Sequence, residues 1–384
     1  MKKIAIVGGG ASGIACAIEL KRNLKDIEVT ILERLPRIGK KILMTGNGKC
    51  NITNMNLSSN NYNTEALNEL LDEFNFDEAK SFFESMGLMM RVDEAGRAYP
   101  YSEKATTVLD VMLNELEKLN VEIKTDYDVG EIKRTDSFLV YSNDYQVNNY
   151  DYLVMAPGGL ASVPEHNSYE LLKRLGHKIT DISPGLVALK TLEKTKSLSG
   201  LRVKAKATIK YGNKELHSTT GEILFKNDGL SGIAIFELSR FFKKKAIISI
   251  DLIPDISDNE LDKYFDNSRS MEEVLNGILP KMVSLDIVNR CKVINKENII
   301  HALHNYEFTV VDTYGYANAQ ITLGGVNRKE VNPFTFASLI VEGMYIIGEV
   351  NDIDGASGGY NLHYAWGSGI LAARDIIRKI KESE

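Results

Sequence analysis

Apolar residues in the first 34 positions alternate between short continuous runs and helical spacing. The run KIAIV at 3–7 ends at glycines and predicts a strand buried on both faces. SGIACAIELKRNL at 12–24 has the spacing of a helix, and EVTILER at 28–34 is strand-like again. A strand, a helix and a second strand in this order predict a β-α-β unit, so the sheet begins with parallel strands.

The next 120 residues repeat both kinds of pattern. Residues 64–90 have amphipathic helical spacing, and a second helix is expected at 103–119. From 121 to 155 the apolar runs become short and alternating. This pattern predicts a small antiparallel meander that returns to the sheet at DYLVMAPGG.

The pattern changes again near residue 183. Alternating strand-like runs and turns predict a small β domain of the barrel type, interrupted by a helical stretch. The last 40 residues hold a buried strand, GMYIIGE, a glycine cluster and a long helix. Because this strand resembles those of the first domain, we predict an α/β domain with an insertion. The expected bounds are 1–185 and 325–384 for the α/β domain, 186–253 and 306–324 for the inserted barrel, and 254–305 for a helical subdomain.

Composition places the chain among globular proteins. Its 384 residues are 43% hydrophobic and 26% charged, which suits two or three domains. The net charge of −6 argues against nucleic acid as the main partner, and we interpret the basic run FFKKKA at 241–246 as a solvated rim. Cys16, Cys50 and Cys291 form no CxxC pair and no metal-like spacing, so we expect a reducing compartment, no disulfide framework and no metal site.

The N-terminus MKKIAIVGGGASGIACAIEL shares some features with a signal peptide. Its short apolar run is interrupted by three glycines, whereas a signal peptide needs a continuous one. No apolar run reaches the length of a membrane-spanning helix, about 18 residues. We therefore expect a cytoplasmic protein without a membrane partner.

A dinucleotide-binding fingerprint lies between the first strand and the first helix. Gly8, Gly10 and Gly13 give the pattern G-x-G-x-x-G, and Glu33 ends the next strand. Gly8 would make the tight turn, Gly10 would let backbone approach a pyrophosphate, and Gly13 would allow close helix–strand packing. Glu33 would accept hydrogen bonds from a ribose, which favours FAD or NAD over NADP.

The C-terminal segment decides between FAD and NAD. A strand ending in Gly348-Glu349 and followed by a glycine-rich helix start is typical of glutathione-reductase-type flavoproteins. The acid there holds the flavin ribityl chain, and the helix points its positive end at the flavin ring. MAPGGLA at 155–161 resembles the strand crossing of the same folds. We therefore predict FAD.

With these motifs assembled, the chain resembles the HI0933-like family of FAD-binding oxidoreductases. The shared motifs span nearly the whole length: IVGGGASGIACAI, GKKILMTGNGKCNITN, YLVMAPGG, TGEILFKNDGLSGIAIFELS, QITLGGVNRKEVNP and GEVNDIDGASGGYNLHYAWGSG. The resemblance implies an α/β fold of the glutathione-reductase type, with a Rossmann-like FAD domain, an antiparallel meander, an inserted β-barrel and a helical subdomain.

The resemblance also implies a set of cofactor-binding positions. The ADP half would contact Gly8, Gly10, Ala11, Ser12, Gly13, Glu33, Arg34 and Val129, and the pyrophosphate and flavin would contact Lys41, Thr45, Gly46, Asn47, Gly48, Cys50, Asn51, Ala156, Gly158, Gly159, Gly348, Glu349, Gly359, Tyr360, Asn361 and Leu362. In one departure, Lys49 stands before Cys50 where family members often have arginine. The positive charge is kept, but bidentate phosphate geometry is lost.

The catalytic residues are not determined by these motifs. Cys50, His363 and Tyr360 are candidates beside the flavin, together with the aromatic residues Tyr364 and Trp366. Each has a structural alternative: a buried cysteine is commonly inert, a histidine in a first helical turn is commonly neutral, and aromatic residues commonly pack in a core. His301 and His304 have helical spacing but no further ligands nearby, so we expect surface residues.

Three functions remain open at this point. The first is an FAD-dependent oxidoreductase of a small molecule, either an oxidase of amine-like substrates or a reductase of activated C=C bonds. The second is a flavin-dependent tRNA-modifying enzyme, and the third is a flavoprotein without turnover. Because no second G-x-G-x-x-G is present, NADH or NADPH would visit the flavin itself, or the substrate would supply the electrons. Without a CxxC pair the chain is not a dithiol–disulfide reductase.

Overall fold

The computed structural model describes residues 1–144, 146–163, 166–265 and 269–383. The chain divides into two compact units: unit 1, made of Met1–Ser183 and Ile321–Glu384, and unit 2, Pro184–Gln320. Each unit has its own cluster of buried apolar residues. The two clusters are the cores of an α/β domain and of an inserted domain.

Unit 1 is built on a five-stranded parallel sheet in the order β19-β10-β1-β2-β6. Its strands are β1 (Lys2–Val7), β2 (Ile27–Leu32), β6 (Glu122–Lys124), β10 (Tyr152–Met155) and β19 (Met344–Ile346). The central strands β1 and β10 are almost entirely buried, which explains their continuous apolar runs. The predicted β-α-β unit and the return of the C-terminal strand to this sheet are confirmed.

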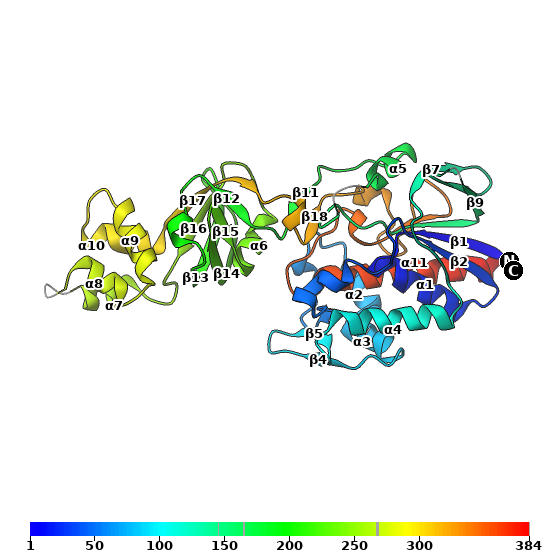
Figure 1. Ribbon diagram of the computed structural model, residues 1–384, viewed down its shortest axis with the longest axis horizontal. Coiled ribbons are helices and arrows are strands. Elements are labelled where there is room, and N and C mark those ends of the chain that lie inside the picture. The colour runs from blue at the N-terminus through cyan, green and yellow to red at the C-terminus, as the bar shows by residue number, and fades with distance from the viewer. Residues whose placement is uncertain (145, 164–165, 266–268, 384) are drawn as a thin grey trace. The chain divides into compact units, whose positions relative to one another are not determined.

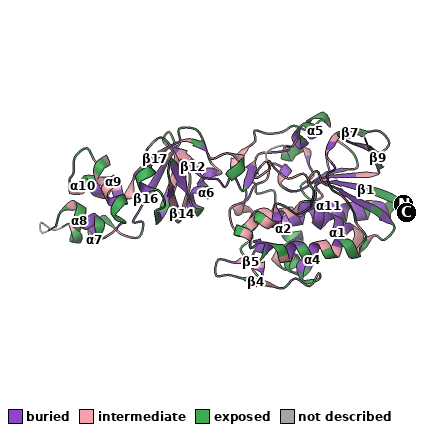
Figure 2. Cartoon of the chain, viewed as in Figure 1, coloured by how far each residue is buried: buried purple, intermediate pink, exposed green. Residues whose placement is uncertain are grey.

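Helices lie on one side of this sheet and a meander on the other (Figure 1). The helices are α1 (Ala11–Asn23), α4 (Ala105–Lys118) and α11 (Tyr360–Ser383). The helices α1 and α11 approach closely because Gly369 lacks a side chain: a Cβ there would lie 2.3 Å from the Ser12 carbonyl oxygen. Figure 2 shows buried residues along β1, α1 and α11.

The antiparallel meander consists of β7 (Val129–Arg134), β8 (Phe138–Ser142) and β9 (Val147–Tyr150). The meander is confirmed, but its predicted start at residue 121 is wrong. Residues 122–124 instead form β6, the edge strand of the parallel sheet, because they pair with β2 rather than with β7.

Unit 1 also contains a set of shorter elements. These are η1 (Ile42–Gly48), β3 (Thr53–Asn54), η2 (Ser59–Asn61), α2 (Asn68–Glu73), α3 (Phe76–Glu84), β4 (Met90–Val92), β5 (Arg97–Pro100), α5 (Ser168–Arg174), β18 (Ile321–Leu323), η6 (Arg328–Glu330) and η7 (Gly348–Val350). The single helix predicted at 64–90 is wrong. It is two short helices, because the side chain of Asn75 accepts a hydrogen bond from the Glu78 amide and starts α3 anew.

Unit 2 contains the predicted barrel, closed by six antiparallel strands in the order β12-β15-β14-β13-β16-β17. The strands are β12 (Leu189–Thr191), β13 (Arg202–Tyr211), β14 (Lys214–Lys226), β15 (Gly229–Ser231), β16 (Ile247–Asp251) and β17 (Tyr306–Thr313). Inward-facing residues of β13 alternate with exposed ones, as a small filled barrel requires. The short strand β11 (Ser183–Gly185) spans the point in the chain where unit 1 ends and unit 2 begins.

Helices complete unit 2. The helix α6 (Ile233–Ser239) packs on β14, and η3 (Lys196–Leu198) and η5 (Tyr316–Asn318) are short turns. The helical subdomain between β16 and β17 comprises α7 (Asp258–Leu261), η4 (Asp262–Tyr264), α8 (Met271–Asn276), α9 (Lys281–Arg290) and α10 (Lys296–His304). No helix in the described part of the chain is long and apolar enough to cross a membrane.

Candidate functional site

The glycine turn between β1 and α1 combines tight packing with one open position. A Cβ on Gly8 would lie 2.2 Å from the Ala156 carbonyl oxygen, and one on Gly13 would lie 2.1 Å from the Gly8 carbonyl oxygen. A Cβ on Gly10 would meet nothing within 4 Å. Gly10 also precedes α1 without any side-chain cap, so the first amides of this helix remain available to an anion.

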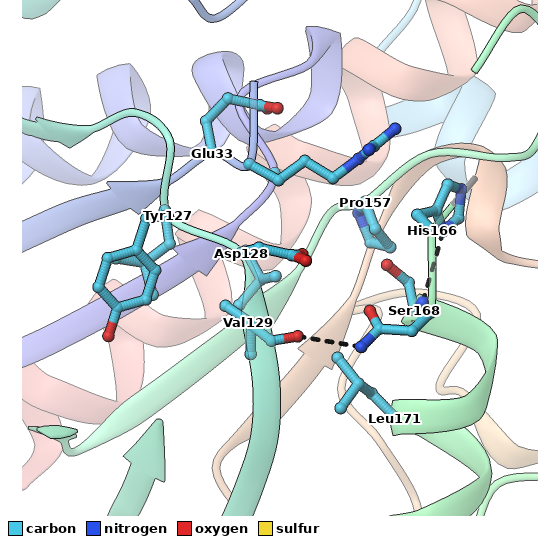
Figure 3. A pocket seen from close by; sticks show the side chains of 13 residues that line it. Glu33, Tyr127, Asp128, Val129, Pro157, His166, Ser168 and Leu171 are labelled. Atoms are coloured by element: carbon cyan, nitrogen blue, oxygen red, sulfur yellow. Dashed lines mark hydrogen bonds between the residues drawn. The ribbon is translucent and has the colours of Figure 1, made fainter. Parts of the chain in front are cut away.

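A pocket opens beside this turn, at the carboxyl ends of β1 and β2 (Figure 3). Its wall includes Glu33, whose Oε2 accepts a 2.8 Å hydrogen bond from the Gly9 amide and whose Oε1 accepts one of 2.9 Å from the Leu35 amide. These amides fix the carboxylate at the end of β2. Each oxygen keeps a lone pair that a ribose hydroxyl could use.

The opposite wall of the pocket comes from the meander and from the segment before α5. Arg34 and Val129, which we predict to bind the cofactor, also line the pocket. The pocket also includes Asp128, His166 and Asn167, which the motifs did not indicate. The side chain of Asn167 donates to the Val129 carbonyl oxygen at 3.3 Å, drawn as a dashed line in Figure 3. No sequence signal marks these residues, because they lie outside the strands and reach the pocket only through tertiary packing.

A second group of predicted residues meets around Glu349. The ammonium of Lys41 donates to Glu349 Oε2 at 2.5 Å, and the Thr322 amide donates to Glu349 Oε1 at 2.7 Å. Gly159 packs against this carboxylate: a Cβ there would lie 2.7 Å from Oε1. A Cβ on Gly348 would similarly lie 2.5 Å from Ser12 Oγ, so both glycines serve close packing.

Thr322 belongs to this group although it was absent from the predicted set. Its hydroxyl oxygen accepts hydrogen bonds from the Leu160 and Ala161 amides, at 2.7 and 3.1 Å. One buried threonine thus connects the segment after β10 with the acid that follows β19. In the sequence, Thr322 lies in the shared motif QITLGG, but no residue of that motif was predicted as part of the site. Gly158, in the same segment, has open space where its Cβ would lie.

The segment from Thr45 to Asn51 has an unusual backbone. Gly46, Asn47, Gly48 and Cys50 all have positive φ angles, between 54° and 82°. The Thr45 hydroxyl donates to the Ile42 carbonyl oxygen and the Cys50 amide to the Thr45 carbonyl oxygen, which hold the turn together. Such a backbone exposes amides and carbonyls where an ordinary helix would pair them.

This segment touches the start of α11. A Cβ on Gly359 would lie 2.8 Å from Asn51 Oδ1 and 2.7 Å from the Thr53 carbonyl oxygen, so only glycine fits. The buried Asn51 Oδ1 accepts no hydrogen bond from any described residue. An unpartnered buried acceptor beside a glycine suits a cofactor with its own N–H group, which a flavin ring has. Asn361 shapes this start through its side chain, which exchanges hydrogen bonds with the Gly355 backbone. Of the other predicted residues, Ala11 begins α1, Ala156 follows β10 and Leu362 lies in the first turn of α11.

The catalytic candidates lie in packed surroundings. Burial raises the pKa of Cys50 to about 12 and lowers the pKa of His363 to about 4. His363 Nε2 donates to the Phe74 carbonyl oxygen and its Nδ1 accepts from the Thr53 hydroxyl, both at 2.8 Å. Tyr360 is buried, and its carbonyl oxygen accepts from the Tyr62 hydroxyl. Cys50 thus has the neutral thiol of an inert buried cysteine, and His363 is a neutral histidine with both nitrogens hydrogen-bonded.

The two aromatic residues further along α11 are also core residues. The Trp366 indole N–H donates to the Ile52 carbonyl oxygen at 3.1 Å, and the Tyr364 hydroxyl accepts from the Asn351 side chain at 3.0 Å. In unit 2, His301 is exposed as expected. His304 is partly exposed, and its two ring nitrogens lie 2.9 Å from Asp251 and 3.3 Å from Asp258. Among the described residues no group of three or more potential metal ligands occurs.

A model of one protein family matches nearly the whole chain. The HI0933-like protein Rossmann domain model covers residues 2–375. The chain belongs to the HI0933-like family. The resemblance seen in the motifs is thereby confirmed.

Curated relatives of this HI0933-like chain have two kinds of name. It is 34% identical to the 3-dehydro-bile acid delta(4,6)-reductase of Clostridium scindens, over 97% of this chain and 98% of that protein. It is 28% identical to the ribosomal RNA dihydrouridine synthase of Haemophilus influenzae, over 97% of this chain and 98% of that protein.

The fold of this HI0933-like chain also occurs in solved structures. Its TM-score is 0.52 against the 3-ketosteroid delta1-dehydrogenase of Sterolibacterium denitrificans, with 11% identity over 99% of this chain and 100% of that chain. At this identity the likeness concerns the fold alone. It agrees with the predicted Rossmann-like domain that carries an inserted domain.

Proposed function

We propose that this HI0933-like protein is an FAD-dependent oxidoreductase that reduces an activated C=C bond of a small molecule. The observation that carries the proposal is the full-length similarity to a named reductase, at 34% identity. The name of that relative indicates C=C bonds in a compound with an oxidised position 3. A C=C bond conjugated to a carbonyl accepts hydride readily, which is chemistry that a reduced flavin supplies.

The residues described above would hold FAD in three parts. Gly10 and the first turn of α1 would bind the pyrophosphate, and Glu33 with the pocket of Figure 3 would bind the adenosine. The Lys41–Glu349 pair would contact the ribityl chain and its neighbouring phosphate. Asn51 and Gly359 would face the polar edge of the ring. The thiol of Cys50 would stay protonated and pack against the ring.

The source of electrons is a nicotinamide cofactor in this proposal. The sequence has no second dinucleotide fingerprint, so NADH or NADPH would bind transiently at the flavin. The proton that completes the reduction needs a donor other than His363, since both of its nitrogens are already bonded. We assign no residue to that role.

The experiment uses the purified full chain. A visible spectrum with flavin bands is expected, and anaerobic NADH or NADPH should bleach them. A bile acid with a 3-oxo group and C=C bonds at positions 4 and 6 should then restore the bands without oxygen. A colourless protein would contradict the cofactor assignment. Bleaching by an amine and not by either nicotinamide would replace the reductase with an oxidase.

A second candidate is a dihydrouridine synthase acting on RNA. Two relatives with that name match over 97% of this chain, at 28% and 27% identity. The chemistry is related, because uracil has a C=C bond conjugated to a carbonyl. Mass spectrometry of ribosomal RNA incubated with the enzyme and NADPH would test it. New dihydrouridine is expected under this candidate and none under the first.

A further inference from the structure

A cluster of lysines lies at one end of the barrel in unit 2. Lys210 is near the end of β13, Lys214 starts β14, and Lys243, Lys244 and Lys245 lie between α6 and β16. The strand pairing brings these segments together, because Lys210 is the Cα partner of Ile247 on β16. The three lysines of the run FFKKKA therefore belong to a larger surface that also includes Lys210 and Lys214.

This surface, which we call the barrel-end patch, is strongly positive. Four of its lysines are exposed and Lys210 is half-exposed. None of the five forms an ion pair with any residue that the structure describes. The only acid within 209–216 and 241–248 is Glu215, the Cα partner of Lys210. These two segments thus carry five lysines against one acid, in a protein whose net charge is −6.

An aromatic ring completes the patch. Tyr211 is 48% exposed, and the Lys243 ammonium lies 5.3 Å from the centre of its ring. Proteins that bind single-stranded nucleic acids combine exposed aromatic rings with basic side chains, since bases stack on the rings while the cationic groups contact phosphates. A lipid surface would need several exposed apolar side chains, and within these two segments only Tyr211 is an exposed large hydrophobic residue.

We propose that the barrel-end patch binds the phosphate backbone of single-stranded RNA. Charge complementarity and the exposed ring favour this partner. The ribosomal RNA enzymes among the relatives make an RNA partner chemically reasonable for this fold. The proposal goes beyond the small-molecule reduction proposed above, and it reverses our sequence-based interpretation of 241–246 as a solvated rim.

The test measures RNA binding by the flavin-loaded full chain. A fluorescein-labelled single-stranded RNA of about 20 nucleotides is titrated in 50 to 200 mM NaCl, and anisotropy gives the Kd. The test variant changes Lys243, Lys244 and Lys245 to glutamine. A matched control changes Lys25, Lys292 and Lys381 to glutamine, which are also exposed and without an ion pair among the described residues. Both variants lose three positive charges.

Because both variants lose the same charge, a difference in RNA affinity between them reports the position of the lysines. The patch variant should bind at least about tenfold more weakly at 50 mM NaCl, and the slope of log K against log[salt] should fall by about 2, that is about 0.7 per lost contact. The control should stay within about twofold of the wild type. Equal weakening by both variants, or no binding by the wild type at 50 mM NaCl, would overturn the proposal.

Two further measurements keep the outcome independent of the proposed activity. Binding to phosphatidylglycerol vesicles without binding to the RNA would assign the patch to lipid and also overturn the proposal. Flavin absorbance and bleaching by NADPH should be the same in wild type and both variants. A failure of the reductase assay would therefore leave the RNA result intact, and the reverse also holds.

Discussion

The ammonium of Lys41 lies 2.5 Å from Oε2 of Glu349, a residue 308 positions later in the chain. The pair joins the segment after β2 to the segment after β19, and its side chains are 31% and 19% exposed. It therefore lies where water screens it only in part. Both residues were predicted to contact the cofactor. Because they also contact each other, each side chain orients the other.

Replacing Lys41 by methionine should weaken FAD binding. The change removes a positive charge near the phosphates and leaves Glu349 without its cation, so we expect about a tenfold increase in Kd. Titration of the deflavinated protein with FAD, followed by flavin fluorescence, measures this value. Lys40→Met, at the exposed neighbouring position, is the control and should change Kd less than about twofold. Equal effects of both substitutions would remove the special role of the pair.

The two glycines of the fingerprint should respond differently to alanine. Gly8 has φ +111° and no room for a Cβ, so Gly8→Ala should lower the free energy of unfolding by about 2 kcal/mol or more. Gly10→Ala meets no neighbouring atom and should unfold like the wild type. Its methyl group would nevertheless occupy the space intended for the pyrophosphate. Thermal melts together with FAD titration check both expectations, and a Gly10→Ala protein with unchanged FAD affinity would contradict the assignment.

The cysteines should differ in reactivity with a thiol reagent. Burial raises the pKa of all three thiols, but Cys16 and Cys50 are fully buried whereas Cys291 is only half-buried and can be reached by a reagent. At pH 8 the native protein should react within minutes at Cys291 at most, and at all three thiols in guanidinium chloride. The Cys291→Ser variant is the control and should be inert when native. Rapid labelling of Cys50 in that variant would revive a nucleophilic role for it.

His363 should make folding depend on pH. Its pKa is lowered from its ordinary value, about 6.5, to about 4 by burial, so the unfolded chain binds a proton in this window and the folded chain does not. The contribution of neutral His363 to the free energy of unfolding is fully present above pH 6.5. It decreases by up to about 3 kcal/mol as the pH falls to 4. Denaturant unfolding of wild type and His363→Gln, compared at pH 7 and pH 4.5, measures the difference. A pH dependence that survives in the variant would come from other groups, among them His166 and His177.

Local patterns in the sequence predicted much of the fold. The β-α-β unit, the meander and the barrel strands each follow from periodicity and turns within about 30 residues, because pleat and helix spacing are local properties. The helix expected at 64–90 failed at Asn75, where a side-chain cap outweighed continuous amphipathic spacing. The predicted meander failed at β6, because strand pairing and not strand pattern decides the sheet to which a run belongs.

The sequence by itself determined that a glycine turn, an acid after β2 and an acid after β19 exist in this chain, and with them the family. Only the tertiary structure decided how these parts meet. In the folded chain the Thr322 amide donates to Glu349, and both ring nitrogens of His363 have hydrogen-bond partners. Five lysines also lie together at one end of the barrel. The physical reason is that such contacts join residues far apart in the chain. They depend on sheet order and on strand register, which no local period encodes.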